Sequence, residues 1–92
     1  MLRIKFNGVL RQVAGCAETT IGLPASRRLS DALEILERNF PGILGSSAEY
    51  QWRYASNQVM VALNGKLVEE NWNEVYLSEG DQLTLLPPIG GG

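Results

Sequence analysis

The chain has 92 residues, with eight basic and ten acidic side chains and a formal net charge of −2. This length fits one domain with a single modest core, and 45% hydrophobic and 20% charged residues are ordinary for a soluble globular protein. The acidic balance disfavours a nucleic-acid-binding protein, which would carry a basic patch. A membrane span is not expected, because no apolar run approaches about 20 residues.

Histidine is absent, and Cys16 is the only cysteine in the sequence. One cysteine can form neither an internal disulfide nor a four-cysteine iron–sulfur cluster, and this cysteine usage favours a reducing, cytoplasmic setting. Without histidine, no Ser-His-Asp or Cys-His arrangement can be built. We therefore expect no bound cofactor or metal, and we expect the chemistry that involves this chain to take place in a partner's active site.

The first part of the chain predicts two antiparallel strands. Apolar and charged residues alternate over 2–6, and a second strand is expected over 17–23. Asn7-Gly8 is a turn signal, but apolar residues continue beyond it. The predicted connection between the two strands is therefore longer than a tight turn.

A helix is predicted next. From Leu29 to Phe40 the apolar residues recur with the helical period, while Ser30 and four charged residues are predicted to lie outside the buried face. Pro41-Gly42 ends the helix. Residues 43–57 are irregular by pattern, although three alternating aromatic residues there are consistent with a short edge strand: Tyr50, Trp52 and Tyr54.

The last part of the chain predicts three more strands. Val59, Val61 and Leu63 alternate with residues of the other face, and Asn64-Gly65 predicts a tight hairpin into a short strand over 66–68. A connection with a turn of helix follows, and a turn at Glu79-Gly80-Asp81 leads into a final strand over 82–86. The order of elements predicts an α+β protein with a β-grasp fold, in which one main helix packs across a mixed sheet of four to five strands.

The chain ends in a segment unlike the rest, Pro87-Pro88-Ile89-Gly90-Gly91-Gly92. Two prolines end sheet pairing because neither has an N–H to donate. Six extended residues reach about 20 Å, and a chain end without Cβ atoms can enter a narrow channel. We therefore divide the chain into a β-grasp domain over 1–86 and a flexible tail over 87–92, which presents the Gly92 carboxylate to another protein.

Five stretches together resemble the MoaD/ThiS superfamily of ubiquitin-like sulfur carriers, and they cover nearly the whole chain. They are Leu29-Ser30-Asp31-Ala32-Leu33, Phe40-Pro41, Val61-Ala62-Leu63-Asn64-Gly65, Glu79-Gly80-Asp81-Gln82-Leu83 and Leu85-Leu86-Pro87-Pro88-Ile89-Gly90-Gly91-Gly92. The family usually ends in two glycines after a variable residue, which here is Gly90. The insertion before the third strand makes the chain more similar to the small subunit of molybdopterin synthase than to the shorter thiamine-pathway carrier.

The resemblance implies a cycle at the C-terminus. An activating enzyme uses ATP to adenylate the Gly92 carboxylate, which is ionised at neutral pH because its ordinary pKa is about 3.5. A sulfur-donor enzyme then supplies the sulfur of a thiocarboxylate. Residues 87–91 (Pro87, Pro88, Ile89, Gly90 and Gly91) bind in the partner, and the large subunit of molybdopterin synthase transfers the sulfur to a pterin precursor. The chain itself is then a carrier or a small subunit of a sulfurtransferase.

Three interpretations remain open from the sequence. The first is this molybdopterin synthase subunit. The second is a carrier for another product (thiazole, cysteine or a modified tRNA base), or a modifier joined to lysines through the same activated terminus. The third is a non-catalytic β-grasp interaction module.

Other residues carry weaker signals. Cys16 is interpreted as an incidental thiol rather than a sulfur carrier, and Lys5 and Lys66 as solvated lysines rather than modification sites. Met60, Trp52 and Trp72 are candidates for an outward apolar patch that binds the larger subunit.

Overall fold

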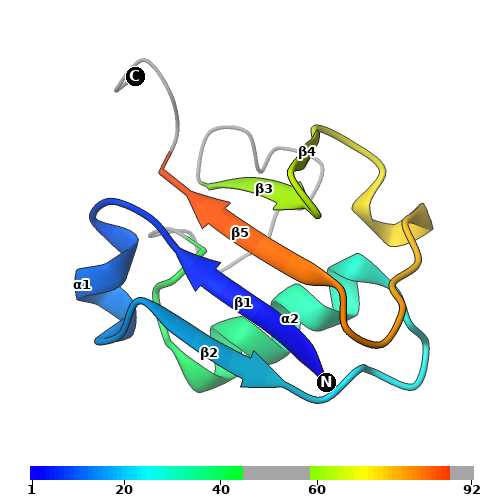
Figure 1. Cartoon of the computed structure of the whole chain (residues 1–92), viewed down its shortest axis with the longest axis horizontal. Coiled ribbons are helices and arrows are strands. Elements are labelled where there is room, and N and C mark those ends of the chain that lie inside the picture. Colours follow the sequence, from blue (N-terminus) through cyan, green and yellow to red (C-terminus); the bar gives the residue numbers. More distant parts are fainter. Residues whose placement is uncertain (45–58, 88–92) are drawn as a thin grey trace.

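The computed structural model describes residues 1–44 and 59–87. Five strands form one mixed sheet in the order β2-β1-β5-β3-β4, and the longest helix lies across one face of it (Figure 1). The strands are β1 (Leu2–Phe6), β2 (Glu18–Ile21), β3 (Met60–Leu63), β4 (Lys66–Val68) and β5 (Gln82–Leu86), and the helices are α1 (Leu10–Ala14), α2 (Leu29–Asn39) and the 3₁₀ helix η2 (Trp72–Glu74). This architecture confirms the predicted β-grasp fold.

Strand β1 has the predicted alternation, since Leu2, Ile4 and Phe6 are buried and the charged residues between them are exposed. It pairs antiparallel with β2, as predicted. Strand β2 is shorter than the predicted 17–23, because Ile21 pairs with Leu2, the first residue of β1, and the ladder ends there.

The connection between β1 and β2 contains a helix that the sequence analysis did not predict. Helix α1 buries Leu10, and Gly15 ends it with φ 80° and an N–H that donates to the carbonyl of Arg11 at 2.8 Å. Five residues are too few to display a helical period, so the sequence pattern predicts only a long connection here.

Helix α2 supplies one wall of the core. Its Leu29, Leu33 and Leu36 are fully buried against the apolar face of the sheet, and Phe40 just beyond it meets Phe6 edge to face at 5.3 Å between ring centroids. The prediction that Ser30 lies outside the buried face is wrong, because only 7% of its surface is exposed.

The start of α2 is covered by the connection that follows η2. The Leu29 N–H donates to the Val75 carbonyl at 2.9 Å, and the Leu77 N–H donates to the Arg27 carbonyl at 2.7 Å. The helical period of α2 does not show that this segment, more than forty positions away in the printed sequence, covers the start of the helix.

The second half of the sheet matches its predicted turns. Asn64 and Gly65 have φ values of 49° and 90°, as a two-residue hairpin between β3 and β4 requires. Strand β5 spans the predicted residues and lies at the centre of the sheet, parallel to β1 and antiparallel to β3. Its Leu83 and Leu85 are fully buried.

Within residues 1–44 and 59–87, no helix is long and apolar enough to cross a membrane, and no three potential metal ligands cluster. The predicted edge strand at Tyr50, Trp52 and Tyr54 lies outside the described residues.

Candidate functional site at the end of the central strand

The predicted reactive tail begins where β5 ends. Strand β5 stops at Leu86, and Pro87 follows it as a half-buried residue. The remaining predicted site residues, Pro88, Ile89, Gly90, Gly91 and Gly92, lie outside the described residues. The structure therefore defines the base of the candidate site, which is the end of β5 and its two neighbouring strands.

On one side, the base contacts the turn that follows β1. The N–H of Asn7 donates to the Leu85 carbonyl at 3.0 Å, which extends the parallel pairing by one residue. Beyond that bond the ring of Pro87 lies against Gly8, a residue with φ 60°. The first residue of the tail is thus in contact with a turn from the beginning of the chain.

On the other side, Leu86 pairs with Met60 of β3. Both side chains point to the sheet face opposite α2, because the residues beside them, Leu85 and Val61, point into the core. Ala62 shares this open face, and so does its β4 partner Leu67, which is 48% exposed. An uncharged surface therefore adjoins the point where the chain leaves the sheet.

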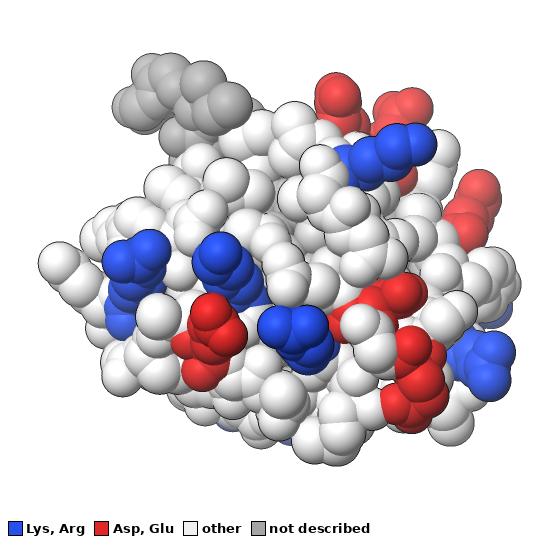
Figure 2. Space-filling model, in the orientation of Figure 1, with Lys and Arg blue, Asp and Glu red and all other residues white. Residues whose placement is uncertain are grey.

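The rest of the open face is polar. Arg3 and Lys5 of β1 lie opposite Thr20 and Glu18 of β2, and all four residues are exposed. Figure 2 shows charged side chains over β1 and β2 and uncharged surface over β5 and β3. A partner that approaches the tail along this face meets an apolar half and a charged half.

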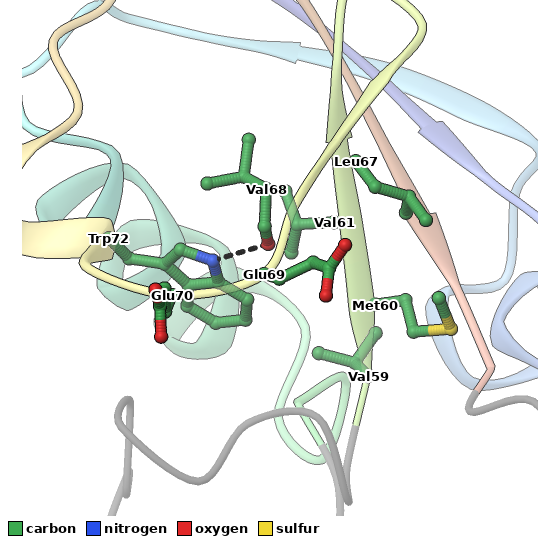
Figure 3. Close-up of a pocket in the computed structure, with 8 residues that line it drawn as sticks. All are labelled: Val59, Met60, Val61, Leu67, Val68, Glu69, Glu70 and Trp72. Carbon is green, nitrogen blue, oxygen red and sulfur yellow. Dashed lines mark hydrogen bonds between the residues drawn. The ribbon is translucent and has the colours of Figure 1, made fainter.

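A hollow of about 760 Å³ lies at the β3–β4 end of the sheet (Figure 3). Its walls include Met60, Leu67 and Trp72, and Glu69 extends across it from the end of β4. Trp72 is 4% exposed, and its indole N–H donates to the Val68 carbonyl at 2.7 Å. The prediction that Trp72 belongs to an outward patch is therefore wrong, because its ring is buried in the core and its N–H is bonded to the backbone.

Met60 is half-buried on the open face, consistent with the place predicted for it, and Trp52 lies outside the described residues. Cys16 is a free, half-buried thiol packed against the core. Lys5 and Lys66 are exposed.

The opposite end of β5 is fixed by the hairpin after β3. The side chain of Asn64 accepts a bond from the Gln82 N–H at 2.9 Å and donates to the Asp81 carboxylate at 3.0 Å. The Asn64 N–H also donates to the Gln82 carbonyl at 2.8 Å, and Asp81 accepts from the Ser78 N–H at 2.8 Å. These bonds set where the central strand begins.

Sequence reasoning missed Gly8 as a neighbour of the tail. Asn7-Gly8 is a turn signal, but the contact of Gly8 with Pro87 joins positions at the two ends of the sequence and depends on the parallel pairing of β1 with β5. Only a parallel pairing of the first strand with the last, which the structure shows, brings the two residues together.

Comparison with known proteins extends these observations. The model of the ThiS family matches residues 4–92 of the chain.

Solved structures have the same fold. The molybdopterin converting factor subunit 1 from Pyrococcus furiosus is 25% identical, with a TM-score of 0.73 over 96% of this chain and 97% of that one. SAMP1 from Haloferax volcanii is 26% identical, with a TM-score of 0.73 over 99% of this chain and 98% of that one. A chain in the complex of subunits 1 and 2 of the molybdopterin-converting factor from Helicobacter pylori is 24% identical, with a TM-score of 0.61 over 99% and 97% of the two chains.

Proposed function

Because the chain belongs to the ThiS family, whose members are ubiquitin-like sulfur carriers, we propose that the carboxyl group of Gly92 carries sulfur between partner enzymes in the cytoplasm. The observation that supports this most is the position of β5. The strand that leads to the tail lies at the centre of the sheet, with both neighbours paired to it, so the tail leaves from the best-supported strand of the domain.

The proposed cycle has two displacements at the C-terminus. In an activating enzyme, a carboxylate oxygen of Gly92 attacks the α-phosphorus of ATP and pyrophosphate leaves. Sulfide (HS⁻), released by a donor enzyme, then attacks the carbonyl carbon and AMP leaves, which gives the thiocarboxylate. Glycine leaves this attack unhindered because it has no Cβ.

The open face around Leu86, Met60 and Leu67 supports a partner-binding role for the base of the tail. An uncharged surface at the point where the chain departs is suited to burial against a partner, since charged residues are depleted from the cores of interfaces. Arg3, Lys5 and Glu18 lie farther along the same face, where a polar rim is expected.

We propose molybdopterin biosynthesis as the pathway, with a large catalytic subunit of molybdopterin synthase as the partner that takes the sulfur. The similarity to the Pyrococcus furiosus molybdopterin converting factor subunit 1 supports this choice. The Helicobacter pylori chain of the same fold is in complex with subunit 2, which is the kind of assembly we propose here.

A role as a protein modifier is the second candidate. It is favoured by the similarity to SAMP1, a small archaeal modifier protein from Haloferax volcanii. Both roles use the same activated terminus, so they differ in the acceptor: a pterin precursor in one case and a lysine side chain in the other.

The first experiment tests the reactive terminus. The purified chain is incubated with its activating enzyme, ATP and sulfide, and intact mass spectrometry is expected to show one oxygen replaced by sulfur. A chain without Gly91-Gly92 should show no change, and a Cys16→Ser chain should show the same change as the wild type. Sulfur that depends on Cys16 would contradict the proposal.

A second experiment separates the two candidates. The thiocarboxylate form is mixed with the large subunit and a pterin precursor, and sulfur transfer is followed by the appearance of dithiolene. In parallel, cell extracts are probed for conjugates of the chain to lysine. Conjugates without dithiolene formation would favour the modifier.

A further inference from the structure

The turn after β1 has a specific relation to the first residue of the tail. Gly8 has φ 60°, and a Cβ atom built on it would lie 3.1 Å from Cγ and 3.4 Å from Cδ of Pro87. A contact of 3.1 Å is tighter than ordinary van der Waals contact between carbon atoms, which is about 3.5–4.0 Å. The absence of a side chain at Gly8 thus leaves the space that the pyrrolidine ring of Pro87 needs.

Among the residues that the structure describes, the other glycines with positive φ have no such close neighbour, since a Cβ atom on Gly42 would meet only Val13 Cγ1 at 4.0 Å. Gly15, Gly65 and Gly80 have φ values of 80–90°, and a Cβ atom on any of them would meet nothing within 4 Å. Their conformations alone explain why glycine suits those turns. Gly8 differs from them because its missing side chain also makes room for a residue of the tail.

Pro87 restricts the backbone at the start of the tail. Proline fixes its own φ near −65° and restricts the preceding residue, Leu86, to extended conformations. Leu86 is already held by its pairing with Met60, and the Asn7–Leu85 bond holds the strand on the other side. Contact with Gly8 therefore holds the Pro87 ring in place at the start of the tail.

The geometry points to Gly8 as a positioning residue that sets the exit direction of the reactive tail, an inference that rests on the proposed function. Gly8 lies on the surface of the turn and contributes no side chain to the core. A methyl group at this position would force the proline ring to shift by a few tenths of an ångström, and we expect this shift to change the direction in which the tail leaves the sheet.

The test is a double-mutant cycle that combines Gly8→Ala with Pro87→Ala. Pro87→Ala removes Cγ and Cδ, the two atoms that the new methyl group would meet. Gly15→Ala is the matched control, since it imposes an alanine on a similar positive φ with open space around it. The readout is ATP–pyrophosphate exchange catalysed by the activating enzyme, with circular dichroism to follow the fold.

We expect Gly8→Ala to lower kcat/KM for exchange about fivefold in the wild-type chain, but less than about twofold in the Pro87→Ala chain. Gly15→Ala should leave exchange unchanged, although it should lower the melting temperature about as much as Gly8→Ala does. A purely structural role for Gly8 would not produce rescue by a second substitution in the tail.

Two results would overturn the inference: equal exchange by wild-type and Gly8→Ala chains, or a loss that persists undiminished in the Pro87→Ala chain. The absence of any exchange with the wild-type chain would instead overturn the proposed function, and it is recognised before the variants are compared. Nuclear Overhauser contacts between the Gly8 Hα and Pro87 Hδ protons check the geometry independently of activity, and their absence would also refute it.

Discussion

Replacing Asn64 by glycine tests how the start of the central strand is held. Asn64 has φ 49°, so glycine keeps the backbone conformation without the strain that alanine would add. The substitution removes two side-chain bonds, one from the Gln82 N–H and one to the Asp81 carboxylate. It changes nothing at the other end of β5, where the tail begins.

The expected loss of stability follows from these two bonds. Each hydrogen bond contributes about 0.5–1.5 kcal/mol net, and the released groups are exposed and can bond to water. The free energy of unfolding should therefore fall by about 1–3 kcal/mol. For a domain of this size, each kcal/mol lowers the melting temperature by roughly 4–8 °C.

Chemical and thermal unfolding followed by circular dichroism measure this loss, and ATP–pyrophosphate exchange reports on the tail. Asn71→Gly is a matched control, because Asn71 also has positive φ, 60°, and its side chain makes no capping bond. Its stability should stay within about 0.5 kcal/mol of the wild type. If Asn64→Gly were no less stable than this control, the bonds to Gln82 and Asp81 would not be what fixes the start of β5.

Three further outcomes are expected. One residue added after Gly92 should abolish adenylation without changing the melting temperature, and normal pyrophosphate exchange by the extended chain would refute the reactive-terminus proposal. Leu67→Ser should weaken binding of the activating enzyme by at least about 1 kcal/mol in titration calorimetry, whereas Tyr76→Ser, which changes a residue 60% exposed beside the start of α2, should not. Trp72→Phe should lower the free energy of unfolding by about 1–3 kcal/mol, because the Val68 carbonyl loses its indole partner, and unchanged stability in urea would contradict this.

The sequence predicted an element correctly where a local residue pattern is compatible with only one structure. The alternation over residues 2–6 predicted β1 with its buried face, because the period of two leaves little choice when one side is covered. The turn at Glu79-Gly80-Asp81 predicted where β5 begins. Asn64-Gly65 predicted its hairpin because few residues tolerate two successive positive φ values. The motifs used for the resemblance, around Asn64 and Asp81, are bonded to each other in the structure.

Three of the errors share one physical cause, which is contact with a segment distant in the sequence. Ser30 has the spacing of an exposed residue, but the connection after η2 covers the start of α2. Trp72 was a candidate for an outward patch, whereas its ring is part of the core. Gly8 was recognised as part of a turn, but its contact with Pro87 depends on the completed sheet.

The parallel pairing of β1 with β5 also determines how the domain responds to mechanical force. Arg3–Phe6 lies alongside Gln82–Leu85 in the same direction, so the chain enters this pair of strands at one end and leaves at the other. A pull between Met1 and Pro87 therefore slides the two strands along each other and loads their hydrogen bonds simultaneously. Pulling the strands apart sideways would break the same bonds one after another, at lower force. An enzyme that pulls on the tail therefore loads the domain along the direction in which unfolding requires the higher force.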